Sequence, residues 1–316
     1  MPDKPAADST DSPAQLPGDA NPTSDQSVAK KRAFKSRFIS TVSLIAIISV
    51  MFWFSQNWLY TVLFSILSLG ALVEYFRLFP LRGFRRFQWQ AYGVSIAYLI
   101  LLFGPFWGFE PNWLSDLDGL AVALLVTLVV LERLRYPLEG FRTLDEIAAT
   151  VFGFIYCVLL FSFMAKIFML PLFSTAGTSS ASFYVLYLVG ITKLTDIGAY
   201  LVGSLIGRDK MIPHVSPAKT WQGFGGAIVF AVTGSYVFIF AMGDQIPLIT
   251  PLHAGVIAFL LALVGVLGDL AESILKRSLE VKDSGQVMPG IGGFLDLIDS
   301  LIFTAPLFYI YLLIFN

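Results

Sequence analysis

The sequence has 316 residues, of which 56% are hydrophobic and only 14% are charged. An ordinary soluble domain has about 45–50% apolar and about 25% charged residues, so this composition excludes a single water-soluble globular domain. A bilayer solvates apolar surface directly, and the composition therefore indicates a membrane protein. The net charge of -1 says little as a total, because in membrane proteins the position of each charge along the chain carries the information.

The predicted elements begin with a tail. Residues 1–28 are rich in Pro, Ala, Ser and Asp and contain no apolar run suited to a signal peptide, so we predict a disordered cytoplasmic tail. A transmembrane helix needs about 20 mostly apolar residues. By this criterion we expect an all-α polytopic membrane protein with about nine spans, five in an N-terminal part (29–175) and four in a C-terminal catalytic part (176–316). The predicted spans are 38–55, 58–79, 91–109, 117–133, 147–168, 183–207, 223–242, 252–275 and 294–315.

Basic residues predict the orientation of these spans. Lys and Arg accumulate in short cytoplasmic loops. Of the 21 basic residues, 18 lie at 30–37 before the first predicted span or at and beyond the ends of the second, fourth, sixth and eighth, whereas the opposite loops carry Asp116, Asp118 and Asp244. The pattern predicts a cytoplasmic N-terminus and a C-terminus across the membrane, in a bacterial-type inner (plasma) membrane.

Charged residues occur inside the later spans, where each costs at least about 2.5 kcal/mol on insertion scales and needs a partner or a role. Lys193 and Asp196 lie three residues apart in the sixth span, as a self-neutralising pair or as part of a site. The eighth span ends with two carboxyl groups, a hydroxyl and an ammonium group on one helical face. These are Asp269, Glu272, Ser273 and Lys276.

The ninth span begins with Asp296 and Asp299 one helical turn apart, and we place Ser300 off their face. If residues 277–293 fold as a hairpin, Asp269, Asp296 and Asp299 converge. Carboxylates at close quarters repel, and a divalent cation is the ordinary resolution. Because the chain has one cysteine and two histidines, oxygen ligands and a hard cation such as Mg²⁺ are expected.

Two predicted cytoplasmic connections carry groups that bind phosphate. Hydroxyl and ammonium groups precede a glycine-rich stretch (223–226) in the first, whose backbone amides could approach a phosphate. Neither connection contains a Walker P-loop, and a surface loop that binds anionic headgroups is the alternative. The residues are Ser216, Lys219 and Thr220 in the first connection, and Lys276, Arg277, Lys282 and Asp283 in the second.

The segment 273–300 resembles the C-terminal signature of the phosphatidate cytidylyltransferase (CDP-diacylglycerol synthase) family. It contains Ser-x-x-Lys-Arg, Lys-Asp-Ser, Pro-Gly-x-Gly-Gly and two aspartates three residues apart, preceded by Gly-Asp-Leu at 268–270. Residues 196–223 are similar to a second block of the family, and Glu74 matches a glutamate that the family tends to carry. The chain departs from the family at Ile291, where histidine is usual, and at Leu297, where arginine is usual.

The resemblance implies transfer of CMP from CTP to phosphatidic acid, with Mg²⁺ as cofactor and a second metal ion left open. It implies further that membrane lipid and the two substrates are the partners, that nucleic acid is not, and that a homodimer is among the oligomeric alternatives. The implied roles are metal binding and catalysis for Asp269, Asp296 and Asp299, catalysis for Lys282, and substrate binding for Asp196, Ser216, Lys219, Thr220, Lys276, Arg277 and Asp283.

Two other functions compete with this one. A CTP-dependent polyprenol or phytol kinase would use the same nucleotide, but the paired aspartates and the Lys-Arg and Lys-Asp-Ser elements argue against it. A transporter could use Lys193, Asp196 and Asp269 as an ion path. The polar features lie near one membrane face and no internal repeat is evident, which disfavours alternating access.

Overall fold

The computed structural model describes residues 57–79, 84–109, 111, 115–281 and 293–316. These residues are mostly helical, and the predicted all-α class holds except for one short hairpin. The elements are α2 (Asn57–Leu78), α3 (Gln88–Leu102), η1 (Gly104–Trp107), α4 (Leu117–Arg133), α5 (Phe141–Phe154), η3 (Ile155–Leu159), α6 (Phe163–Ile167), α7 (Ala181–Ile206), β1 (Lys210–Ile212), β2 (Ser216–Thr220), α8 (Trp221–Met242), η4 (Gly243–Gln245), α9 (Pro251–Ser278) and α10 (Phe294–Phe315).

Six helical stretches of the described chain are long and apolar enough to cross a membrane, and the protein is an integral membrane protein. Each of the eight predicted spans after the first coincides with a helix, but α3 and α4 have only 15 and 17 residues. At 1.5 Å per residue, α3 is about 22 Å long, which is less than the hydrocarbon thickness of about 30 Å. Gly104 and Pro105 end it and begin η1. The predicted span 38–55 lies outside the described residues, within which six helical stretches qualify as candidate spans, so the count of nine is not confirmed.

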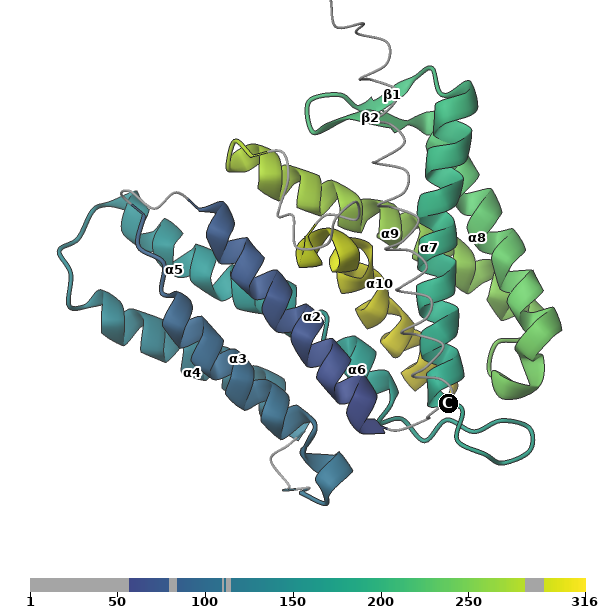
Figure 1. Cartoon of the computed structure of the whole chain (residues 1–316), viewed down its shortest axis with the longest axis horizontal. Coiled ribbons are helices and arrows are strands. Elements are labelled where there is room, and N and C mark those ends of the chain that lie inside the picture. Colours follow the sequence, from purple (N-terminus) through teal and green to yellow (C-terminus); the bar gives the residue numbers. More distant parts are fainter. Residues whose placement is uncertain (1–56, 80–83, 110, 112–114, 282–292) are drawn as a thin grey trace, which may run out of the picture.

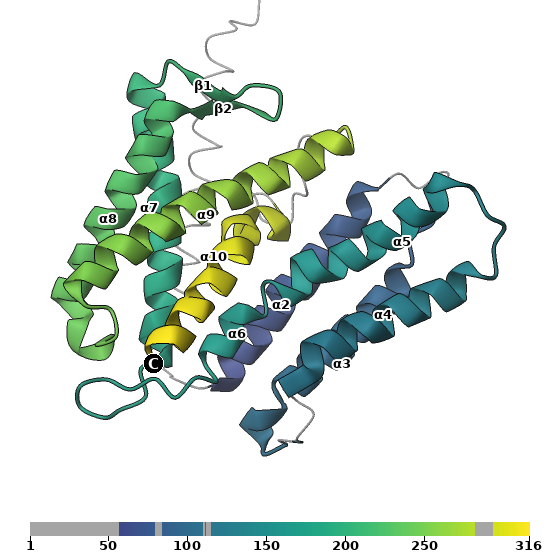
Figure 2. The ribbon, with the colours of Figure 1, turned by 180° about the vertical axis from the view of Figure 1, so that it is seen from behind.

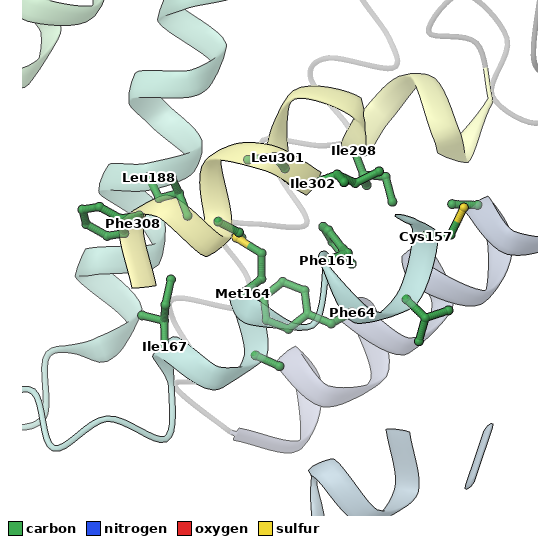
Figure 3. Close-up of a cluster of buried hydrophobic side chains, with 14 of the residues drawn as sticks. Phe64, Cys157, Phe161, Met164, Ile167, Leu188, Ile298, Leu301, Ile302 and Phe308 are labelled. Carbon is green, nitrogen blue, oxygen red and sulfur yellow. The ribbon is translucent and has the colours of Figure 1, made fainter. Parts of the chain in front are cut away.

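The helices form two groups with α10 between them (Figure 1). The N-terminal half, α2 to α6, lies on one side of α10, and α7, α8 and α9 lie on the other, as the view from behind also shows (Figure 2). Buried side chains from α2, η3, α6, α7 and α10 meet around this central helix (Figure 3). Both halves therefore contact the helix that carries the paired aspartates.

Glycines bring α7 and α8 into close contact. A Cβ atom at Gly198 would lie 2.6 Å from the carbonyl oxygen of Gly226, and one at Gly226 would lie 2.5 Å from the Val202 side chain. Small residues let helix backbones approach in this way. Gly223, Gly225 and Gly226 belong to the first turns of α8 and not to a loop, and close helix packing explains Gly223 and Gly226.

Strands β1 and β2 form an antiparallel hairpin between α7 and α8. The hairpin and the last turns of α9 lie at the end of the molecule opposite the C-terminus, and α10 begins below them (Figures 1 and 2). The hairpin is therefore held next to the C-terminal end of α7 and the N-terminal end of α8.

Candidate active site

Three carboxyl groups from three helices surround the hydroxyl group of Ser300. Ser300 Oγ lies 2.5 Å from Asp269 Oδ1 of α9 and 3.5 Å from Asp196 Oδ1 of α7. It also lies 3.2 Å from Oδ1 of its neighbour Asp299. Because a hydroxyl group carries one proton, it can donate to only one of these oxygens. We call Asp196, Asp269, Asp299 and Ser300 the Ser300 cluster.

Two lysines contact the Ser300 cluster from different sides. Lys219 of β2 places Nζ 3.2 Å from Asp269 Oδ2, so the hairpin delivers a positive charge to α9. Lys193 of α7 places Nζ 3.3 Å from Asp196 Oδ2 and 3.4 Å from the carbonyl oxygen of Leu297. The sequence left open whether Lys193 is a paired residue or part of the site, and the structure shows that it is both paired and next to the cluster.

Asp296 belongs to a second group of charges. Lys276 Nζ lies 2.9 Å from Glu272 Oε1 and contacts Asp296 Oδ1. The other oxygen of Asp296 accepts a hydrogen bond from the backbone amide of Gly293 at 2.7 Å. The hairpin-like approach of α9 and α10 therefore brings the predicted carboxyl groups to the same region, but Asp269 and Asp299 meet around Ser300 while Asp296 pairs with Lys276.

The two groups together are negatively charged. When all are ionised, their five carboxyl groups and three ammonium groups leave a formal charge of -2. Oxygen donors with an excess of negative charge suit a hard divalent cation. Within the described ranges, however, no three His, Cys, Asp or Glu side chains are arranged to hold a metal ion. The oxygen donors thus suit Mg²⁺, although Asp296 lies apart from the other two predicted ligands, Asp269 and Asp299.

A cavity of about 380 Å³ opens beside the Ser300 cluster. Its polar wall contains Asp196, Asp269, Lys219 and Thr220, and the remainder is mainly apolar and glycine surface from α7, α8, α9 and the hairpin. A site of this kind offers charge at one side and apolar surface at the other. Such a surface suits a lipid phosphate, whose phosphate group would lie at the charged side and whose acyl chains would lie along the apolar side.

The other predicted substrate-binding residues have different surroundings. Thr220 is the N-cap of α8, and its hydroxyl oxygen accepts a hydrogen bond from the amide of Gly223 at 3.1 Å. Ser216 is half-buried at the start of β2. Arg277 is exposed near the end of α9. Lys282 and Asp283 lie outside the described residues, as does Ile291.

Sequence reasoning placed Ser300 off the face of the aspartates, and this was wrong. Four residues are also about one helical turn, so Ser300 shares the face of Asp296 and its hydroxyl points to α9 and α7. Glu272 was recognised as part of the polar stripe but was not chosen as a site residue. Its spacing of four residues from Lys276 is the signal that could have identified the pair.

Comparison with known proteins supplies the family. A sequence model described as the cytidylyltransferase family matches residues 35–315. A protein of Escherichia coli (strain K12) called uncharacterized protein YnbB is 34% identical, over 81% of this chain and 80% of its own length. The phosphatidate cytidylyltransferase of Bacillus subtilis (strain 168) is also 34% identical, over 71% of this chain and 78% of its own length. The phosphatidate cytidylyltransferase of Staphylococcus saprophyticus is 33% identical, over 64% of this chain and 72% of its own length. With its paired aspartates on α10 and almost its whole length matched, this chain belongs to the cytidylyltransferase family.

Proposed function

We propose that this protein transfers the CMP moiety of CTP to phosphatidic acid, giving CDP-diacylglycerol and pyrophosphate. The observation that carries the proposal is the convergence of charged residues from α7, β2, α9 and α10 around Ser300 and Lys276 in a membrane protein of this family. Two relatives that match this chain over 78% and 72% of their own length carry the name phosphatidate cytidylyltransferase.

In the proposed reaction, a phosphate oxygen of phosphatidic acid attacks the α-phosphorus of CTP. One P–O bond forms, the bond between the α-phosphorus and the bridging oxygen breaks, and pyrophosphate leaves with that oxygen. The nucleophile is already an anion, so little acid–base chemistry is needed. Catalysis then rests on positioning two polyanions and on neutralising their charge. Lys219 and Lys276 are the described ammonium groups that we assign to the phosphates, together with the exposed Arg277.

We assign Asp269, Asp296 and Asp299 as the residues that would hold Mg²⁺. When bound, this ion would polarise phosphate oxygens and neutralise negative charge. The formal charge of -2 in the two groups supports a divalent cation rather than none. Lys193 contacts Asp196, and we assign it to balancing charge within the membrane rather than to the phosphates, because it lies in the middle of α7, a turn farther than Asp196 from the end that leads into the hairpin.

We place the site at the cytoplasmic face of a bacterial-type inner membrane. The C-terminal ends of α2, α7 and α9 lie on the side of the molecule that carries the hairpin (Figures 1 and 2). Basic residues occur at or just after these helix ends, among them Arg77, Arg208 and Arg277. Basic residues favour the cytoplasmic side. The same side supplies CTP, and it sets the charged groups at the depth of lipid headgroups.

Isotope transfer tests the proposal directly. Purified protein is incubated with phosphatidic acid, Mg²⁺ and CTP labelled either at the α-phosphorus or at the γ-phosphorus, and the lipid is extracted. Label should enter lipid from the α position only, in a product that co-migrates with CDP-diacylglycerol. Asp118→Asn, which alters the contact with Lys166 in the N-terminal half, is the control and should retain transfer. Entry of γ label would instead indicate a lipid kinase, and no transfer of either label would contradict the proposed function.

A further inference from the structure

A buried glutamate of the N-terminal half contacts the helix that carries the paired aspartates. Glu74 lies on α2, and its residue is only 2% exposed. An isolated carboxyl group is costly to bury without hydrogen bonds. Its contacts therefore indicate why it is tolerated there, and they lead to α10.

The side chain of Glu74 caps the first turn of α10. Its Oε2 atom accepts a hydrogen bond from the backbone amide of Leu295 at 2.9 Å. The first amides of a helix have no partner within the helix, and the helix dipole favours negative charge at this end. The second oxygen, Oε1, is buried and has no hydrogen-bond partner among the described residues. Glu74 thus holds α10 by its terminus rather than by its side.

Gly293 gives this carboxyl group its room. A Cβ atom at Gly293 would lie 2.3 Å from Glu74 Oε2 and 2.7 Å from Glu74 Cδ, closer than atoms can pack. The amide of the same glycine donates to Asp296 Oδ2. Two carboxyl groups therefore divide the amides at the start of α10, Asp296 from within the helix and Glu74 from outside it.

We propose that Glu74 is a positioning residue, which fixes the start of α10 and thereby the places of Asp296, Asp299 and Ser300. These three residues lie within the first two turns after the amide that Glu74 binds. A change in the rotation or depth of that first turn moves all three together. This inference rests on the proposed function for its kinetic consequence, but not for the cap itself.

A mere anchor between the two halves of the protein would have the same contacts. The two roles differ in what a variant changes. Loss of an anchor lowers stability and leaves the folded molecules active, whereas loss of a positioning residue lowers the turnover of molecules that are still folded. A displacement of about 1 Å at reacting groups costs on the order of 100-fold in rate.

The experiment uses Glu74→Leu, which removes the acceptor, and Glu74→Gln, which keeps an oxygen able to accept from Leu295. Glu146→Gln is the matched control, because Glu146 is equally buried but pairs with Arg133 away from α10. Full-length protein in detergent is followed by hydrogen–deuterium exchange of the peptide that covers the start of α10. The rate of CDP-diacylglycerol synthesis is measured per folded molecule, together with KM for CTP.

We expect Glu74→Leu to speed exchange at the start of α10 about tenfold, as loss of a helix cap does. We expect kcat to fall between about 10-fold and 100-fold with KM for CTP changed much less, and Glu74→Gln to recover part of both losses. Glu146→Gln should lower the melting temperature and leave kcat unchanged.

Unchanged exchange at the start of α10 in both Glu74 variants would overturn the inference. Faster exchange with an unchanged kcat would leave a cap but would overturn the positioning role. If the unaltered protein makes no CDP-diacylglycerol, the proposed function fails, and the exchange measurement still decides whether Glu74 fixes α10. Glu74→Gln keeps the test decisive if Glu74→Leu does not fold.

Discussion

The two halves of the protein treat buried charge differently. In the N-terminal half, the buried Glu146 pairs with Arg133, whose Nε lies 3.4 Å from Glu146 Oε2. Glu146 also accepts a hydrogen bond from the backbone amide of Arg85 at 2.8 Å. Around Ser300 and Lys276 in the C-terminal half, carboxyl groups outnumber ammonium groups. In the first arrangement the carboxylate charge of Glu146 faces a guanidinium group, whereas the second keeps an excess of negative charge, which suits a cation. On the proposed function, we assign the reactive part to the C-terminal half.

Packing differs in the same direction. Large buried aromatic residues such as Tyr75, Tyr98 and Phe154 fill the N-terminal half. The contact between α7 and α8 depends instead on glycines, whose missing side chains let the backbones approach. This approach sets the place of the hairpin and so of Lys219 beside Asp269. The close approach of α7 to α8 thus positions a charge, which the aromatic packing of the N-terminal half does not do for the Ser300 cluster.

The strongest way to break the comparison is to remove a carboxyl group from the Ser300 cluster. Asp299→Asn should reduce CDP-diacylglycerol synthesis by about 10²–10³-fold, because charge that is organised for the transition state is lost. Rates measured across a Mg²⁺ titration check this prediction. Asp118→Asn in the N-terminal half is the control, and it should change the rate little.

Asp296→Asn sharpens the result, because Asp296 lies with Lys276 rather than in the Ser300 cluster. On the proposed metal assignment this variant should also abolish most CTP turnover and shift the Mg²⁺ dependence. Retained turnover with an unshifted Mg²⁺ dependence would refute the assignment of Asp296 to the metal and leave Asp269 and Asp299 as candidates.

A smaller effect is expected from the contact of α7 with α8. Gly226→Val adds a side chain where a Cβ atom already meets Val202 at 2.5 Å. Overpacking of this kind costs about 1–3 kcal/mol, so the melting temperature in detergent should fall. A shift of α8 also moves the hairpin that precedes it, so the rate of CDP-diacylglycerol synthesis should fall about tenfold as well. Gly225→Val is the matched control, since a Cβ atom at Gly225 meets nothing within 4 Å. Equal effects of the two substitutions would contradict the close-packing role.

The smallest effect concerns a charge pair at the surface of the N-terminal half. A hydrogen bond from Arg85 lowers the pKa of Glu139 below its ordinary value of 4.5. A lowered pKa of an acid contributes stability above the ordinary value, and this contribution is lost as the pH falls through the lowered pKa. Glu139→Gln should therefore melt slightly below the unaltered protein at pH 7, and the difference should shrink as the pH falls below 4.5 and through the lowered pKa. Exposed pairs contribute little, so the difference should be small. A difference that grows on acidification would contradict the stated sign.

Several elements followed from local sequence. Runs of apolar residues located the helices from α2 to α10, because burial in a bilayer requires a long apolar stretch wherever the chain crosses. Spacing located Asp296 and Asp299 at the start of a helix and Asp269 near the end of another. These properties depend on neighbours along the chain, which the sequence lists in order.

Helix lengths were predicted less well. The span at 91–109 was expected to continue as one helix, but Gly104 and Pro105 divide it into α3 and η1. The glycines at 223–226 were assigned to a phosphate loop, because their composition is the same in a loop and in a helix that packs closely. Only the position of α7 opposite α8 distinguishes the two.

The sequence by itself determined that this is a membrane protein, where most of its helices lie, and which charged residues stand within them. Tertiary structure decided which charges meet: Ser300 with Asp269 and Asp196, Lys276 with Asp296, and Glu74 with the start of α10. The last pair is separated by 221 positions. Hydropathy and helical period act over a few residues, whereas hydrogen bonds and ion pairs depend on distances of about 3 Å that only the packing of the helices sets.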